Sequence, residues 1–170
     1  HPIVSETLAD EESVTELKNV YSLSDEPIIL CLPGSRKSEI DRLMPTFGET
    51  LKKFSNALPS AKFILPSTPD VFEYSEKYLN CMPKDIIFLT PKKSGLEKYL
   101  EFKKASFKIS HLALAASGTV SLELAANNTP MVIGYDMNFL SRQIIGFMLK
   151  TDTVNLVNLV TGNRNIPECL

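Results

Sequence analysis

The sequence lacks paired cysteines and long apolar runs. Its three cysteines, Cys31, Cys81 and Cys169, are odd in number, far apart in the chain and form no CxxC pair. This pattern argues against a disulfide framework and against a zinc site, and it favours a reducing cytoplasm. No stretch approaches the roughly 18 consecutive apolar residues that a membrane helix needs, so we expect no segment that spans a bilayer.

The common catalytic and cofactor motifs are also missing. The chain contains no P-loop, no G-x-S-x-G turn and no metal-ligand spacing, and the turn Pro33-Gly34-Ser35-Arg36 lacks the G-x-G-x-x-G of a dinucleotide fold. NAD binding is therefore disfavoured, and we predict neither a cofactor nor a metal. His1 and His111 are weak candidates for acid–base chemistry, and the apolar surroundings of His111 favour a place in the core or at a strand edge.

The length of the chain and the distribution of its charges indicate one domain preceded by an acidic segment, here called the lead-in. The 170 residues can form a sizeable core, and seven of the 20 acidic residues but only one of the 18 basic residues lie in residues 1–26. We predict a lead-in over residues 1–26 and a domain over residues 27–170. Because the remaining basic residues are scattered without aromatic interleaving, we expect no nucleic-acid groove. The start His1-Pro2 has no initiator Met or signal peptide, so we expect a piece of a longer protein.

Apolar runs alternate with helical patterns along the whole chain. The runs predict six strands: Ile28–Leu32, Lys62–Leu65, Ile86–Leu89, Phe107–Ala116, Met131–Gly134 and Thr153–Val157. This alternation is typical of a doubly wound α/β domain, a Rossmann-like parallel sheet with helices on both faces. We predict the strand order 3-2-1-4-5-6.

The helical patterns lie between these runs. Helices are predicted up to Val20, from Ser38 to Asn56, and over 69–79, 95–104, 119–127 and 138–149, with a truncated helix at 166–168. Pro45 predicts a kink or a restarted first turn. The strongly apolar 138–149 segment is interpreted as a helix against the sheet, and the alternative is contact with acyl chains or a membrane surface.

The predicted strand order brings two small-residue turns together at the switch point. Gly34, Ser35 and Arg36 follow the first strand, and residues 117–119 (Ser117, Gly118 and Thr119) follow the fourth. A helix start with small residues and one arginine can cradle a diphosphate. The alternatives are that Ser117 or Thr119 is an ordinary N-cap and that Arg36 is a surface ion-pair partner.

Two further polar residues lie within reach of these turns. Glu123 is one helical turn beyond Thr119, where a carboxylate could accept both hydroxyls of a ribose or could simply be a solvated helix acid. Asn158 follows the predicted sixth strand, where it could reach the same crevice or serve turn chemistry.

Taken together, these residues resemble the lipid-A-disaccharide synthase family of two-Rossmann-domain (GT-B) glycosyltransferases. The resemblance covers nearly the whole chain in order. It is carried by the opening His1-Pro2, by Leu32–Arg36 followed by Ser38-Glu39-Ile40, by Ala113–Tyr135, and by Val157-Asn158-Leu159 with Gly162 and Glu168. It implies the C-terminal, donor-binding half of an inverting hexosyltransferase of lipid A biosynthesis. That enzyme moves 2,3-diacylglucosamine from its UDP donor to the lipid acceptor 2,3-diacylglucosamine 1-phosphate.

The resemblance also implies roles for individual residues. Arg36 would hold the diphosphate with help from Ser117 and Thr119, Glu123 would contact the ribose, and Asn158 would line the donor pocket. The acceptor site and catalytic base would lie in an absent N-terminal half, and an absent tail would help to form a homodimer. The family implies a cytoplasmic enzyme at the inner membrane. We expect this chain to bind UDP weakly and to lack transferase activity by itself.

The sequence departs from the family pattern at two places, and two alternative functions stay open. Asp136 stands where the family commonly has a basic residue, and Asn163-Arg164 stands where Arg-Glu is usual. One alternative keeps the fold but makes the chain half of a UDP-sugar epimerase or of another GT-B transferase. The other is a non-catalytic α/β interaction module.

Overall fold

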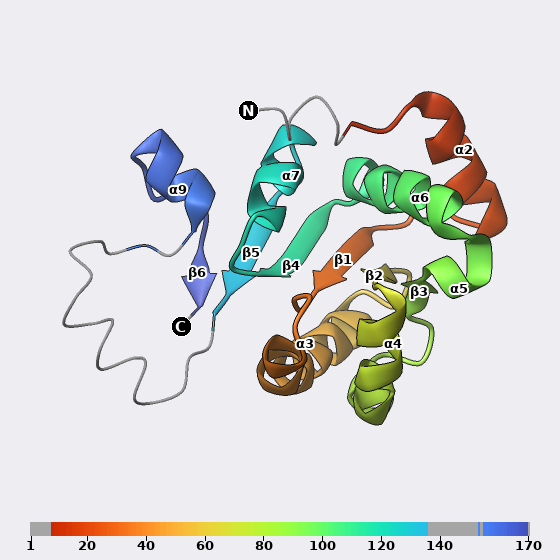
Figure 1. The fold of residues 1–170 in the computed structure, drawn as a ribbon, viewed down its shortest axis with the longest axis horizontal. Coiled ribbons are helices and arrows are strands. Elements are labelled where there is room, and N and C mark those ends of the chain that lie inside the picture. The colour runs from red at the N-terminus through yellow and green to blue at the C-terminus, as the bar shows by residue number, and fades with distance from the viewer. Residues whose placement is uncertain (1–7, 136–152, 154, 170) are drawn as a thin grey trace.

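The chain folds around one parallel sheet. The computed structural model describes residues 8–135, 153 and 155–169. Six strands lie in the order β3-β2-β1-β4-β5-β6 (Figure 1), which confirms the predicted order for the first five, whereas the sixth is formed by another segment than predicted. Their bounds are β1 Ile28–Leu32, β2 Lys62–Pro66, β3 Ile87–Leu89, β4 Leu112–Ala116, β5 Met131–Gly134 and β6 Glu168–Cys169.

The two central strands are apolar because both faces of the sheet are covered. All five residues of β1 are buried. On one side β1 pairs with β2, and on the other with β4, with Ile29 opposite Leu112 and Leu32 opposite Ala115. The chain leaves β1 for β2 on one side and later enters β4 on the other, so a switch point lies between β1 and β4.

Helices cover both faces and confirm the doubly wound architecture (Figure 1). On one face lie α2 (Glu11–Val20), α6 (Leu96–Ile109) and α7 (Val120–Ala126); on the other lie α3 (Lys37–Ala57), α4 (Pro69–Ser75) and the 3₁₀ helix η1 (Glu76–Cys81). Each face has its own apolar core. Leu17, Leu30 and Phe107 belong to the first core, and Ile29 and Phe47 belong to the second.

The helix α2 joins the predicted acidic lead-in to the core. Asp10 caps it by accepting a hydrogen bond from the Ser13 amide at 2.7 Å, and acids fill its first turn, where the helix dipole favours them. Its apolar side is short, but Val14 and Leu17 are buried in the same core as α6. The helix is thus stabilised by packing against α6, which its short apolar side needs.

The predictions for the C-terminal region are wrong. The expected strand from Thr153 is replaced by a helix, α9 (Leu156–Thr161), which Asn155 caps by accepting from the Val157 amide at 2.8 Å. The expected truncated helix is instead β6, in which Glu168 pairs with Ile133 of β5. The capping preference of Asn155 outweighs the apolar pattern that suggested a strand.

Several helix boundaries also differ from the predictions. Phe107–Ile109 belong to α6 because Phe107 packs into the core as a helical residue, so β4 begins only at Leu112. α3 runs without a break through Pro45, and its N-cap is Arg36 rather than Ser38. The helix predicted over 69–79 divides into α4 and η1, and a short helix, α5 (Pro91–Ser94), was not predicted. His1, Asp136 and the helix predicted over 138–149 lie outside the described residues.

Candidate functional site

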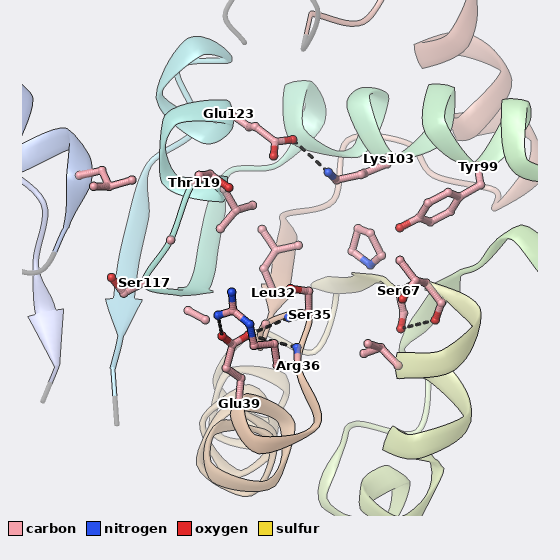
Figure 2. Close-up of a pocket in the computed structure, with 18 residues that line it drawn as sticks. Leu32, Ser35, Arg36, Glu39, Ser67, Tyr99, Lys103, Ser117, Thr119 and Glu123 are labelled. Atoms are coloured by element: carbon pink, nitrogen blue, oxygen red, sulfur yellow. Dashed lines mark hydrogen bonds and ion pairs between the residues drawn. The ribbon is translucent and has the colours of Figure 1, made fainter. Parts of the chain in front are cut away.

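A cavity of about 500 Å³ opens where β1, β2 and β4 end, which is the edge where open α/β sheets bind ligands. The two predicted turns both line it: Gly34, Ser35 and Arg36 on one side, and Ser117, Gly118, Thr119 and Glu123 on the other. The structure therefore brings together seven of the eight predicted site residues (Figure 2). The cavity lies within the range typical of small-molecule sites.

The turn after β1 presents hydrogen-bond donors that already hold a carboxylate. Glu39 Oε2 accepts from the amides of Ser35 at 2.9 Å and Arg36 at 3.2 Å, while Glu39 Oε1 pairs with Arg36 Nη1 at 2.9 Å. Gly34 permits this approach because its φ is +115° and a Cβ there would lie 2.3 Å from Glu39 Oε2. Two amides and a guanidinium thus converge on one oxyanion.

The turn after β4 leads directly into α7. Thr119 occupies the N-cap position, but its backbone is helical and its side chain makes no capping hydrogen bond. The ordinary N-cap interpretation therefore does not describe the Thr119 hydroxyl, which is exposed at the cavity. The start of α7 leaves backbone amides without intrahelical partners, as every helix start does.

Glu123 is not a solvated helix acid. Its Oε2 pairs with Nζ of Lys103 at 3.0 Å, and the two side chains are only 21% and 28% exposed. The pair joins α7 to α6 across the cavity wall (Figure 2). Because Lys103 holds one oxygen of Glu123, the carboxylate has a fixed position from which it can accept hydrogen bonds from a ligand.

The sequence patterns missed Tyr99, Lys103, Glu39 and Ser67, which all line the cavity. Tyr99 is 6% exposed, and burial together with the nearby Glu123 raises the pKa of its hydroxyl. The spacing of four between Tyr99 and Lys103 places both on one face of α6 and could have indicated them. Glu39, three residues after Arg36, matches the position of the acid in a capping box.

Asn158 does not line the cavity. It is 1% exposed, and its side chain bonds Ile166 O at 3.0 Å, Glu168 Oε1 at 2.9 Å and the Ile166 amide at 3.2 Å. These contacts fasten β6 to α9. A role for Asn158 in donor binding stays a prediction.

His111 has a structural contact and lies away from the cavity. Its Nδ1 accepts a hydrogen bond from the Ile28 amide at 3.2 Å, where β1 begins. The side chain is exposed, so the strand-edge placement is confirmed and the core placement is wrong.

Chemically, the arrangement can bind an oxyanion at one end and hydroxyl groups beside Glu123. Within the described part of the chain, no group of three His, Cys, Asp or Glu side chains could hold a metal ion. Among the same residues, no helix is both long and apolar enough to cross a membrane.

Comparison with known proteins then decides the family, because the model of the lipid-A-disaccharide synthetase family matches residues 1–170. The chain belongs to the lipid-A-disaccharide synthetase family. A lipid-A-disaccharide synthase from Ruegeria pomeroyi is 41% identical over 170 residues, which are 100% of this chain and 42% of that protein. A second, from Rhodospirillum centenum, is 33% identical over 100% of this chain and 40% of its own length. The chain thus spans about two fifths of these relatives of the synthetase family.

Solved structures support the same fold for this synthetase-family chain. The Escherichia coli ADP-heptose LPS heptosyltransferase II matches with a TM-score of 0.59 and 19% identity, over 75% of this chain and 38% of that one. At this identity the likeness shows the fold alone. The predicted Rossmann-like α/β fold is confirmed.

Proposed function

We propose that this chain is the donor-binding half of a lipid-A-disaccharide synthase and that its cavity binds the UDP moiety of UDP-2,3-diacylglucosamine. The complete enzyme would transfer the diacylglucosamine to 2,3-diacylglucosamine 1-phosphate with inversion. The observation that carries this proposal is the convergence of oxyanion donors at Ser35 and Arg36 with the Glu123–Lys103 pair in one cavity at the switch point.

The diphosphate is assigned to the turn after β1. The carboxylate of Glu39 demonstrates that the amides of Ser35 and Arg36, with the Arg36 guanidinium, form a geometry that holds an oxyanion. Arg36 is 78% exposed and can turn toward a second anion. Since UDP leaves in the reaction, a cation and fixed amides here would stabilise the charge that develops on its phosphates. Ser117 and Thr119 would assist from the opposite turn.

The ribose is assigned to Glu123. Ribose hydroxyls donate hydrogen bonds, and a carboxylate held in place by Lys103 offers them an acceptor without having to be ordered first. This position, one turn into α7, lines the same cavity as the proposed diphosphate site.

We assign the other functions of the complete enzyme to residues outside this chain. The lipid acceptor site and the general base are proposed to belong to the portion of the relatives' length that this chain does not cover. We likewise propose that the complete enzyme works on the cytoplasmic side of the inner membrane as a peripheral protein and forms a homodimer.

Titration of the chain with UDP by calorimetry tests the proposal. We expect binding in the millimolar range or tighter and a loss of roughly tenfold or more in Arg36→Ala, because hydrogen bonds to a charged group contribute about 1.5–3 kcal/mol. Glu123→Ala should weaken UDP but leave inorganic pyrophosphate unaffected. Lys37→Ala, an exposed neighbour in α3, is the matched control and should bind normally. Absence of heat with millimolar UDP would favour an interaction module instead.

A further inference from the structure

Tyr99 places an unused hydrogen-bonding group in the wall of the cavity. The residue lies in α6, is 6% exposed, and its hydroxyl points into the cavity (Figure 2). Its hydroxyl forms no hydrogen bond with any residue that the structure describes. The hydroxyl is open to the cavity, and the hydroxyl of a largely buried tyrosine usually has a hydrogen-bond partner. The orientation of Tyr99 therefore indicates that the partner comes from whatever fills the cavity.

The surroundings of Tyr99 differ from those of Arg36. Ser67 lies near Tyr99, whereas Arg36 and Ser35 lie on another side of the cavity (Figure 2), whose lining also includes the apolar side chains of Pro66 and Val71. An apolar wall with one or two polar groups is suited to a flat heterocycle rather than to a phosphate. The two ends of the cavity thus select different parts of one ligand.

The order of these groups follows the order of groups in a nucleoside diphosphate. Arg36 offers an oxyanion site across the cavity from Glu123 and Lys103, and Tyr99 lies on the side of Lys103 away from Glu123 (Figure 2). Phosphate, ribose and base are joined in the same sequence. A ligand anchored at Arg36 and Glu123 would therefore direct its base toward Tyr99.

The protonated Tyr99 hydroxyl is able to donate a hydrogen bond. Burial and the nearby Glu123 raise the pKa of the hydroxyl, so it keeps its proton at neutral pH and can donate. The matching group on a pyrimidine such as uracil is a ring carbonyl. Ser67, whose hydroxyl bonds the Thr68 carbonyl at 3.2 Å, is less available as a donor.

We propose that the Tyr99 hydroxyl donates a hydrogen bond to a carbonyl of the nucleobase and thereby selects the base of the donor nucleotide. This inference rests on the proposed function, because it takes the nucleotide as the ligand. It adds a residue for base recognition at the end of the cavity opposite Arg36.

The test compares Tyr99→Phe, which removes only the hydroxyl, with the unchanged chain. We expect the affinity for UDP to fall about fivefold, the usual effect of one neutral hydrogen bond. Affinities for inorganic pyrophosphate and ribose 5-phosphate, which lack the base, should not change. Tyr78→Phe is the matched control, since its hydroxyl bonds Asp41 at 2.7 Å outside the cavity. Thermal unfolding of both variants reports whether the fold is retained.

Two analogues of UDP provide a second measurement. In each of them, one of the two ring carbonyls of uracil is replaced by a thiocarbonyl. Sulfur is a weaker hydrogen-bond acceptor than oxygen, so the analogue whose sulfur faces Tyr99 should bind the unchanged chain less tightly than UDP does. In Tyr99→Phe, this analogue and UDP should bind equally tightly. Equal losses for UDP and ribose 5-phosphate would place Tyr99 at the sugar and overturn the proposal, as would no loss at all. If the unchanged chain binds no UDP, the proposed function itself fails, which is a separate outcome.

Discussion

The carboxylate of Glu39 occupies the place that we propose for a phosphate oxygen. It accepts both amides of the turn after β1 and also pairs with Arg36, so the donors proposed to bind the diphosphate are engaged within the chain. This single side chain has two consequences. It caps the start of α3, and it competes with any anionic ligand for the same donors.

Glu39→Gln should therefore strengthen UDP binding. Removing the negative charge lowers repulsion toward the diphosphate and releases Arg36, and we expect about a threefold gain at low salt that shrinks as salt screens the charges. The weaker cap should lower the free energy of unfolding by roughly 0.5–1 kcal/mol. Calorimetry at two salt concentrations and a thermal melt measure both effects.

The control for this change lies in the same helix. Glu49 is exposed in α3 and outside the cavity, so Glu49→Gln should leave UDP affinity as it was. A Glu39→Gln variant that binds UDP less tightly than the unchanged chain would mean that Glu39 shapes the turn for the ligand rather than competing with it.

At the scale of elements, packing on both sides made the central strands predictable from sequence. β1 is a continuous apolar run, and the turns at its end and at the end of β4 carry the residues that the strand order brings together. The C-terminal elements were not predictable in this way, because α9 and β6 depend on Asn158, whose contacts with Ile166 and Glu168 join segments eight and ten residues apart. No local periodicity reports such a contact.

The same limit applies to the candidate site. Gly34, Arg36 and the 117–119 turn were indicated by their position after strands, but Tyr99 and Lys103 reach the cavity from α6, which crosses above it. Their place depends on how α6 packs against the sheet, a property of the tertiary structure. Only the spacing of four between them was visible in the sequence.

Gly48 allows α3 to pack closely against η1. A Cβ at this position would lie 2.3 Å from the carbonyl oxygen of Cys81, which is backbone and cannot turn away. Gly48→Ala should lower the free energy of unfolding by about 1–3 kcal/mol, although alanine favours an isolated helix by roughly 1 kcal/mol.

Urea denaturation measures this change, with Glu49→Ala as the control. That substitution, one position along α3 on the exposed side, should change stability by no more than about 0.5 kcal/mol. A Gly48→Ala variant that is more stable than the unchanged chain would show that α3 and η1 can separate without cost.

At the scale of the whole molecule, the cavity proposed to hold a nucleotide has its acidic side chains engaged in other contacts. Its lining residues in the described part of the chain include no histidine, and the two carboxylates, Glu39 and Glu123, are ion-paired. Tyr99 has a raised pKa and holds its proton. General base catalysis needs an unprotonated group within hydrogen-bond reach of the nucleophile, and both carboxylates are engaged elsewhere, Glu39 by the turn after β1 and Glu123 by Lys103.

The chain alone should therefore bind UDP without forming the disaccharide. Incubated with UDP-2,3-diacylglucosamine and 2,3-diacylglucosamine 1-phosphate in detergent, it should yield no product by thin-layer chromatography, while the complete Ruegeria relative, of which this chain covers 42%, serves as the positive control. UDP should inhibit the control enzyme. It should also bind the isolated chain in a parallel titration, which shows that the lack of product comes from a missing base and not from a misfolded site. Product formation by the isolated chain above a heat-treated sample would contradict the division of the active site between two halves.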